Sequence, residues 1–134
     1  PRSTRALSST ASDVYKRQLH NYPAPDMFLF DPKRVNVLGE YGGIGLPVEN
    51  HLWWNKRNWG YVQFKNSDEV TAEYVKYANI LKDYVKRGFS AAVYTQTTDV
   101  EGEVNGLMTY DRKVIKIDEA AVKKANQSVI NELK

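Results

Sequence analysis

The chain has 134 residues, and its 19 basic and 16 acidic side chains give a formal net charge of +3. It contains no cysteine, which excludes a disulfide framework and any metal site built from thiolates. The sequence has no apolar run near the roughly 18–20 residues that a membrane-spanning helix needs, so we expect no membrane span.

The first eighteen residues differ in composition from the rest of the chain. They are rich in Ser, Thr, Arg and Ala and show no helical or strand period, so they cannot bury a core. Residues Asp13 to Gln18 resemble the translated end of a transposase adapter that is used to prepare sequencing libraries. We therefore expect residues 1–18 to be a non-native, disordered tail, and the alternative is a natural disordered tail.

This tail accounts for the positive charge of the chain. Its four basic residues and one acid give +3, so residues 19–134 hold 15 basic and 15 acidic side chains and carry no net charge. A basic patch is the usual mark of nucleic-acid or anionic-membrane binding. The apparent basicity supports neither, and we expect no nucleic-acid partner.

A short strand is predicted over residues 35–39, because this β-branched, apolar run is typical of a parallel strand that is covered on both faces. Gly39 and the Gly42-Gly43 pair are expected to end it. Glu40 would then lie at the C-terminal end of a parallel strand, where α/β folds carry their chemistry. The alternative is a surface glutamate beside a turn.

Residues 42–66 are predicted to form a long loop, rich in Gly, Asn and Trp. Loops of this length are usually functional or disordered, and the segments Leu52-Trp53-Trp54 and Trp59-Gly60-Tyr61 argue against disorder. Two interpretations of these aromatic residues stay open. Their rings could stack on the apolar face of a pyranose, or they could fill a small core within the loop.

The rest of the chain alternates between helices and strands. A helix is predicted over 67–87 with Ser67 as its N-cap, a buried strand over 89–95, a polar loop from residue 96, and a final helix over 119–132. This order predicts an α/β fold in which parallel strands are joined by right-handed crossovers. The two polar loops would therefore open on the same side of the sheet.

Three blocks of residues 19–118 resemble glycoside hydrolase family 2, which contains β-galactosidases, β-glucuronidases and β-mannosidases. The middle block is the most specific, because Glu-Tyr-Gly after an apolar strand resembles the nucleophile signature of that family. The blocks are His20-Asn21-Tyr22, then Gly39-Glu40-Tyr41-Gly42-Gly43, and then Val93-Tyr94-Thr95-Gln96 through Asp99, Glu101, Glu103 and Asn105-Gly106 to Tyr110-Asp111-Arg112.

The resemblance implies a fold and a reaction. The fold would be the C-terminal part of a TIM (β/α)8 barrel, about strands seven and eight with their helices, and the upstream barrel and its β-sandwich domains would be missing. The reaction would be hydrolysis of a β-glycoside with retention of configuration, with Glu40 as the nucleophile and a carbohydrate as the partner. No cofactor is implied.

The resemblance also implies a missing proton donor. The acid/base glutamate of the family belongs to an Asn-Glu pair on another strand, and the chain contains that pair only at Asn131-Glu132, in the last predicted helix. A nucleophile without its acid lacks a contribution of roughly 10²–10⁴-fold. We therefore expect the chain by itself to be inactive as a glycosidase.

Further residues are predicted to contact the sugar. Tyr22 would donate a hydrogen bond to the nucleophile, or else serve in packing, and three acids of the second loop would form either a binding rim or a solvated edge. His51 is expected to be structural, and neither histidine has the spacing of a metal ligand. The candidate substrate contacts are His20, Asn21, Tyr22, Trp54, Gln96 and Asp99, and the three acids are Asp99, Glu101 and Glu103.

Two other classes of protein remain as alternatives. The first is a non-catalytic carbohydrate-binding α/β domain that uses the Trp-rich loop. The second is a small α/β interaction domain whose basic tail acts as a nucleic-acid arm, which the adapter origin of residues 1–18 disfavours.

Overall fold

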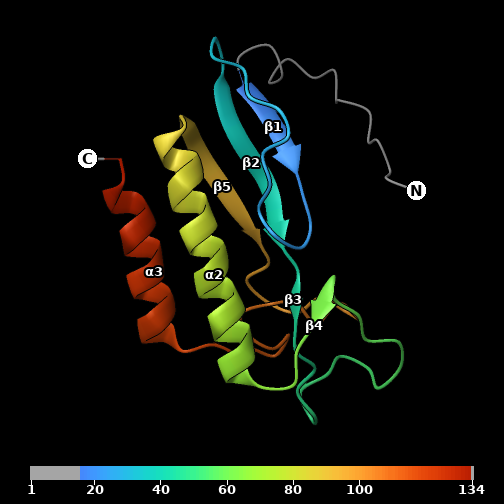
Figure 1. Ribbon diagram of the computed structural model, residues 1–134. Coiled ribbons are helices and arrows are strands. Elements are labelled where there is room, and N and C mark those ends of the chain that lie inside the picture. Colours follow the sequence, from blue (N-terminus) through green and yellow to red (C-terminus); the bar gives the residue numbers. More distant parts are fainter. Residues whose placement is uncertain (1–15, 134) are drawn as a thin grey trace.

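In a computed structural model, residues 16–133 of the protein are described and form a mixed α/β fold (Figure 1). Most of the elements follow the predicted order, and three unpredicted strands are added to it, namely β1 and the very short β3 and β4. The elements are β1 (Lys16–His20), β2 (Val35–Gly42), β3 (Ile44–Gly45), β4 (Val62–Gln63), α2 (Ser67–Lys86), β5 (Phe89–Thr95) and α3 (Glu119–Asn131).

The main sheet has three parallel strands in the order β1-β2-β5, and β3 and β4 form a separate parallel pair. The expected alternation of parallel strands and helices is therefore confirmed. The described strands form an open sheet rather than a closed barrel, with β1 and β5 at its two outer positions. Among the described residues, no helix combines the length and the hydropathy that crossing a membrane would require.

Strand β2 is longer than predicted. It passes through Gly39 and Glu40 and ends at Gly42, whose φ of 111° suits only glycine. Pairing on both sides explains the extension, because His20 of β1 is opposite Glu40 and Tyr94 of β5 is opposite Tyr41. The ladder bonds of a central strand outweigh the modest cost of a glycine in its interior.

Strand β1 begins at Lys16, so residues 16–18 of the segment that we assigned to the tail pair with Val35, Asn36 and Val37. Residues 1–15, which carry the rest of that assignment, lie outside the described residues. Strand pairing uses main-chain groups, which every residue except proline supplies in full. The assignment to a disordered tail is therefore wrong for residues 16–18, whatever their origin.

The helices begin and end close to the predicted positions. Asp118 caps α3 as its side chain accepts a hydrogen bond from the amide of Ala121 at 3.0 Å. The N-cap of α2 is Asn66, one residue before the predicted Ser67, and its side chain accepts from the amide of Glu69 at 2.9 Å. The Ser67 hydroxyl is engaged elsewhere, because it donates to the carbonyl of Lys116.

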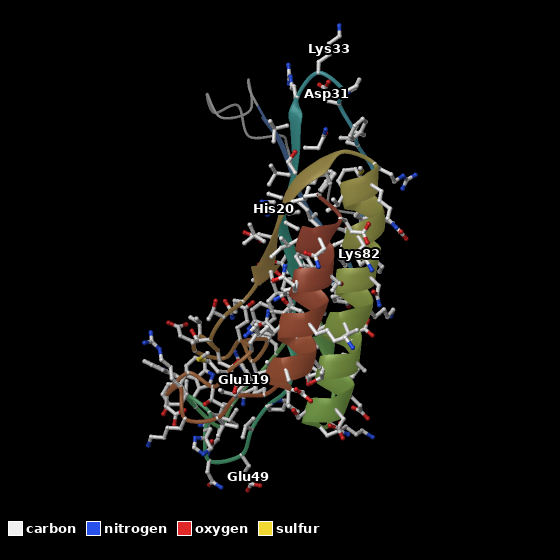
Figure 2. The ribbon with its side chains drawn as sticks, turned by 90° about the vertical axis from the view of Figure 1, so that its left-hand side faces the viewer. His20, Asp31, Lys33, Glu49, Lys82 and Glu119 are labelled. Atoms are coloured by element: carbon white, nitrogen blue, oxygen red, sulfur yellow. The ribbon has the colours of Figure 1, made fainter. Side chains whose placement is uncertain are left out.

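The core lies between the sheet and α2, and α3 packs beside α2 (Figure 1). The Tyr74 hydroxyl donates to Asn126 Oδ1 at 3.0 Å and joins the two helices. The turn with Asp31 and Lys33 lies at one end of the molecule, and the loop with Glu49 lies at the other (Figure 2). The buried core residues are Leu19, Leu38, Tyr41, Ile44, Leu46, Val70, Tyr74, Tyr77, Leu81, Phe89 and Val122.

Candidate active site

Glu40 lies near the C-terminal end of the central strand β2, and its side chain is 40% exposed. Its Oε2 atom accepts a hydrogen bond from the Tyr22 hydroxyl at 2.8 Å and lies 3.1 Å from His20 Nδ1. The fold thus brings together three residues that the sequence analysis selected. Asn21 stabilises the turn that follows β1. Its main-chain N–H donates to the Glu40 carbonyl at 2.9 Å, and its side-chain Nδ2 donates to the Ala24 carbonyl at 2.7 Å.

The two contacts define which oxygen of the Glu40 carboxylate is available for chemistry. Both of them fall on Oε2, so Oε1 is the oxygen that could attack a substrate. Burial raises the pKa of Tyr22, a hydrogen bond with Thr95 opposes this, and the hydrogen bond with Glu40 adds to it. Tyr22 therefore stays protonated at neutral pH, as a hydrogen-bond donor must.

An aromatic wall extends from Tyr22 and consists of Tyr22, Tyr61 and Trp59. The rings of Tyr22 and Tyr61 are stacked, with centroids 3.8 Å apart and planes 7° apart, and Trp59 meets Tyr61 edge to face at 5.6 Å. Gly43, whose φ is 69°, makes this arrangement possible because a Cβ there would overlap the Tyr61 ring. The wall therefore depends on Gly43, the second of the two glycines that follow Glu40-Tyr41.

The aromatic residues of the long loop lie at the surface. Trp53, Trp54, Trp59 and Tyr61 are 60%, 50%, 46% and 48% exposed. Exposure of this size favours the interpretation as a binding surface over the interpretation as a small core within the loop. A contact of Trp54 with sugar remains a prediction.

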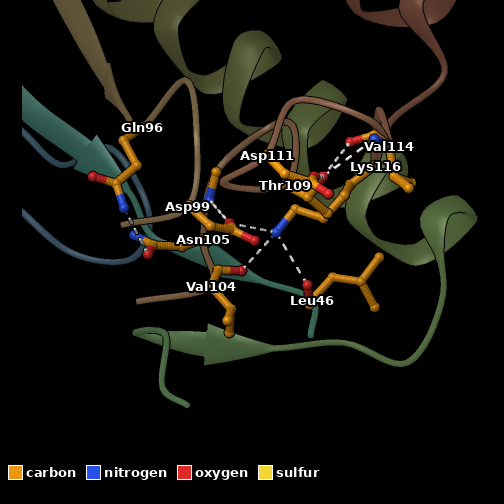
Figure 3. Close-up of polar contacts among 10 residues, drawn as sticks. Leu46, Gln96, Asp99, Val104, Asn105, Thr109, Asp111, Val114 and Lys116 are labelled. Carbon is orange, nitrogen blue, oxygen red and sulfur yellow. Dashed lines mark hydrogen bonds and ion pairs between the residues drawn. The ribbon is translucent and has the colours of Figure 1, made fainter. Parts of the chain in front are cut away.

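Gln96 follows directly after β5, at the same end of the sheet as Glu40. Its side-chain amide donates to Asn105 Oδ1 at 3.4 Å, and its main-chain amide bonds to the Asn105 carbonyl (Figure 3). Both loops that follow β2 and β5 thus open on one side, as the topology predicted. A contact between Gln96 and substrate remains a prediction.

Asp99 is placed differently from the expected substrate contact. It is 5% exposed, and its Oδ1 atom accepts from Lys116 Nζ at 2.6 Å and from the Gly106 amide at 2.8 Å. The Lys116 ammonium group also donates to the carbonyls of Leu46 and Val104 (Figure 3). Asp99 therefore links its own loop segment to those of Gly106 and Lys116 from the inside. Its carboxylate is turned toward these partners, so it is not available to a substrate at the surface.

Sequence reasoning missed Lys116. Its only signal is a single lysine within the apolar run Val114-Ile115-Lys116-Ile117, a pattern that equally suits an exposed strand residue.

Glu101 is exposed and Glu103 half-buried, and within residues 16–133 no group of three or more His, Asp or Glu side chains could hold a metal ion. His51 contacts Asp111 Oδ2 through Nδ1 at 2.9 Å.

Glu132, the acid of the Asn131-Glu132 pair, lies at the opposite end of the sheet from Glu40. Its carboxylate forms ion pairs with Lys82 at 3.4 Å and Lys86 at 3.6 Å, in the last turns of α2. That end of α2 connects directly to the start of β5, whereas Glu40 lies near the finish of the parallel β2 (Figure 1). Glu132 therefore cannot assist Glu40.

No protein-family model matches the chain, and no curated protein matches it. A functional assignment therefore depends on the geometry around Glu40 and on the motif residues.

Proposed function

We propose that this chain is the C-terminal part of the catalytic barrel of a retaining β-glycosidase, similar to β-galactosidases, with Glu40 as its nucleophile. One observation carries the proposal: a half-exposed glutamate near the C-terminal end of a parallel strand accepts a hydrogen bond from the Tyr22 hydroxyl on the same carboxylate oxygen that lies 3.1 Å from His20 Nδ1. The exposed aromatic wall beside it offers flat surfaces for a sugar ring. Strands β2 and β5 would be strands seven and eight of the barrel, and further strands would add to the outer edges of the sheet.

The reaction would follow from this geometry in two steps. Glu40 Oε1 attacks the anomeric carbon, the bond to the leaving oxygen breaks, and that oxygen takes a proton from a general acid. Water then attacks the anomeric carbon and gives its proton to the same group, which now acts as a base. The bond from that carbon to Glu40 Oε1 breaks, and the sugar leaves with retained configuration. The general acid must lie roughly 5–5.5 Å from Glu40. Because Glu132 is held by lysines at the other end of the sheet, that acid would come from outside residues 16–133.

Mechanism-based labelling tests the nucleophile. The complete protein that contains this chain is treated with 2-deoxy-2-fluoro β-glycosides that carry good leaving groups, then digested and examined by mass spectrometry. We expect one fluoroglycosyl group on Glu40, because the fluorine slows hydrolysis of the covalent intermediate. The sugar that reacts would identify the specificity.

Two variants complete this experiment. Glu40→Gln should abolish the adduct and lower kcat by orders of magnitude, whereas Glu49→Gln, an exposed glutamate in the following loop, should do neither. An adduct on another residue, or turnover that survives Glu40→Gln, would contradict the assignment.

A second candidate function is carbohydrate binding without catalysis. The observation that favours it is the exposure of three tryptophans and Tyr61 in one loop. It predicts that the complete protein binds sugars but gives no adduct and no hydrolysis in the same experiment.

A further inference from the structure

A second aromatic cluster lies on the loops at the same end of the sheet as Glu40. It consists of Trp53 and His51 from the loop after β3, and Tyr110 and Asp111 from the loop after β5, and we call it the Trp53–Tyr110 cluster. The two rings meet edge to face, with centroids 5.3 Å apart and planes 75° apart. Neither ring takes part in the contacts of Glu40 or in the aromatic wall.

The rings of this cluster are open to solvent. Trp53 is 60% exposed and Tyr110 is 36% exposed. The edge-to-face contact therefore leaves more than half of Trp53 accessible to a ligand. Large exposed aromatic surface of this kind is typical of binding sites rather than of structure alone.

Polar contacts fix the two loops on which the rings stand. Asp111 Oδ2 contacts His51 Nδ1 at 2.9 Å, and Asp111 Oδ1 accepts from the Thr109 hydroxyl at 2.6 Å and from the Lys113 amide at 3.1 Å. The hydrogen bond from Thr109, followed by that from His51, holds the pKa of Asp111 well below its usual range. The Asp111 carboxylate is therefore ionised at neutral pH. Its contacts hold the two loops, and with them the rings of Trp53 and Tyr110, in place before a ligand binds.

The chemistry of the cluster selects a sugar among the possible ligands. A pyranose has an apolar face of C–H bonds that stacks on an aromatic ring, and a rim of hydroxyl groups that needs polar partners. The cluster supplies both kinds of group, because the ring of Trp53 is exposed and the polar side chains of His51 and Asp111 stand on the same two loops. A nucleic acid would need a basic patch, and a stable protein partner would bury roughly 800 Å² on each side, which is far more than two aromatic rings offer.

We propose that the Trp53–Tyr110 cluster is a second carbohydrate-binding site, separate from Glu40, that stacks one pyranose of a β-linked glycan on Trp53. An equatorially linked chain presents its C–H faces along its length, so one unit can bind here while other units extend along the loops. The site binds glycans whether or not Glu40 is a nucleophile, so it goes beyond the proposed function.

Affinity electrophoresis of the full chain tests the site. Native gels contain mixed-linkage β-glucan, β-1,4-galactan or glucomannan, and gels with the α-linked dextran serve as reference. We expect retardation by at least one β-linked glycan, and at least about tenfold weaker binding for Trp53→Ala, since the loss of one anchoring aromatic residue is typically that large. Trp53→Tyr, which keeps a flat ring, should retain most of the binding.

The controls separate this site from other causes of retardation. Phe28→Ala removes an aromatic residue of the β1–β2 connection with nearly the same exposure, 61%, and should leave binding unchanged. The labelling of Glu40 and the retardation by glycans are separate readouts, so a failure of the nucleophile assignment and a failure of this site give different results. The proposal is overturned by an absence of retardation in all three β-glycans, by unchanged binding of Trp53→Ala, or by a loss that follows Trp54→Ala instead.

Discussion

Asp99 and Lys116 are charged residues inside the protein, 5% and 1% exposed, and their contact has a clear electrostatic cost. Burial raises the pKa of Asp99 and lowers the pKa of Lys116, even though the attraction between them opposes both shifts. The loss of hydration is therefore the larger effect for each group. The pair persists because the carbonyls of Leu46 and Val104 also accept from the ammonium group.

Removing one partner of this pair should destabilise the fold strongly. Lys116→Met would leave the Asp99 carboxylate buried without its counterion, and Asp99→Asn would do the same to the ammonium group, each with an expected loss of about 3–5 kcal/mol. The double variant should lose less than the sum of the two, because no uncompensated charge remains. Urea unfolding measures these differences, and Lys124→Met on the exposed face of α3 is the matched control. Additive losses would contradict this account.

The sequence predicted part of the site at the residue scale. Glu40, His20 and Tyr22 were selected from their motifs, and the structure places them in direct contact. The sequence could not show that Asp99 is buried whereas Glu101 is exposed. It shows that three acids share a loop, but not which of them turns inward. That direction depends on Lys116, which is 17 residues away along the chain.

At the scale of elements, local signals were reliable and non-local pairing was not. Helical periodicity and capping residues predicted α2 and α3 to within about one residue at most of their ends. Strands β3 and β4 were missed, because each has two residues and exists only through a partner about 18 positions away. Strand β1 was missed as well, because residues 16–18 were assigned to a disordered tail and pair only with the distant residues 35–37. The end of β2 was misplaced for a similar reason, since Gly39 looks like a strand end until both neighbouring strands are known.

The first residues of β1 offer a test of the sheet edge. A chain that starts at residue 16 keeps the ladder pairs of residues 16–18 with Val35, Asn36 and Val37, whereas a chain that starts at residue 19 loses them. We expect the shorter chain to be less stable by roughly 1–3 kcal/mol, given about 0.5–1.5 kcal/mol for each lost hydrogen bond. Thermal unfolding followed by circular dichroism compares the two.

A replacement separates main-chain pairing from side-chain identity in that test. With Val-Thr-Val in place of residues 16–18, the ladder should persist and stability should match or exceed that of the chain starting at residue 16, because β-branched residues suit strands. Equal stability of the chains starting at residues 16 and 19 would show that these pairs contribute nothing.

At the scale of the whole molecule, tyrosines form much of the packing between the sheet and α2. The rings of Tyr41 and Tyr77 lie 6.4 Å apart, those of Tyr41 and Tyr94 5.6 Å, and those of Tyr74 and Tyr94 5.0 Å. Burial raises the pKa of all four phenols above the ordinary value of 10.0. The folded protein therefore retains phenolic protons that the unfolded chain would release.

This retention should make the fold sensitive to alkali. Above about pH 10 the unfolded chain binds fewer protons than the folded one, so the free energy of unfolding falls as the pH rises. Phenolate absorbance of these tyrosines should appear together with the loss of the circular dichroism signal, rather than before it. Phenolate formation in a chain that is still fully folded would contradict the assignment of burial as the cause.

Tyr94 and Tyr74 provide a matched pair of variants for the same core. The Tyr94 hydroxyl is buried near the Ile44 main chain without a hydrogen bond of good geometry, whereas the Tyr74 hydroxyl donates to Asn126. Tyr94→Phe should therefore leave stability at neutral pH unchanged or raise it by up to about 1 kcal/mol, and Tyr74→Phe should lower it by about the same amount. In both variants the free energy of unfolding should fall less between neutral and alkaline pH than it does in the unaltered protein, because each variant removes one group with a raised pKa. A loss of neutral stability in Tyr94→Phe as large as that in Tyr74→Phe would show that the Tyr94 hydroxyl has a partner in the folded protein.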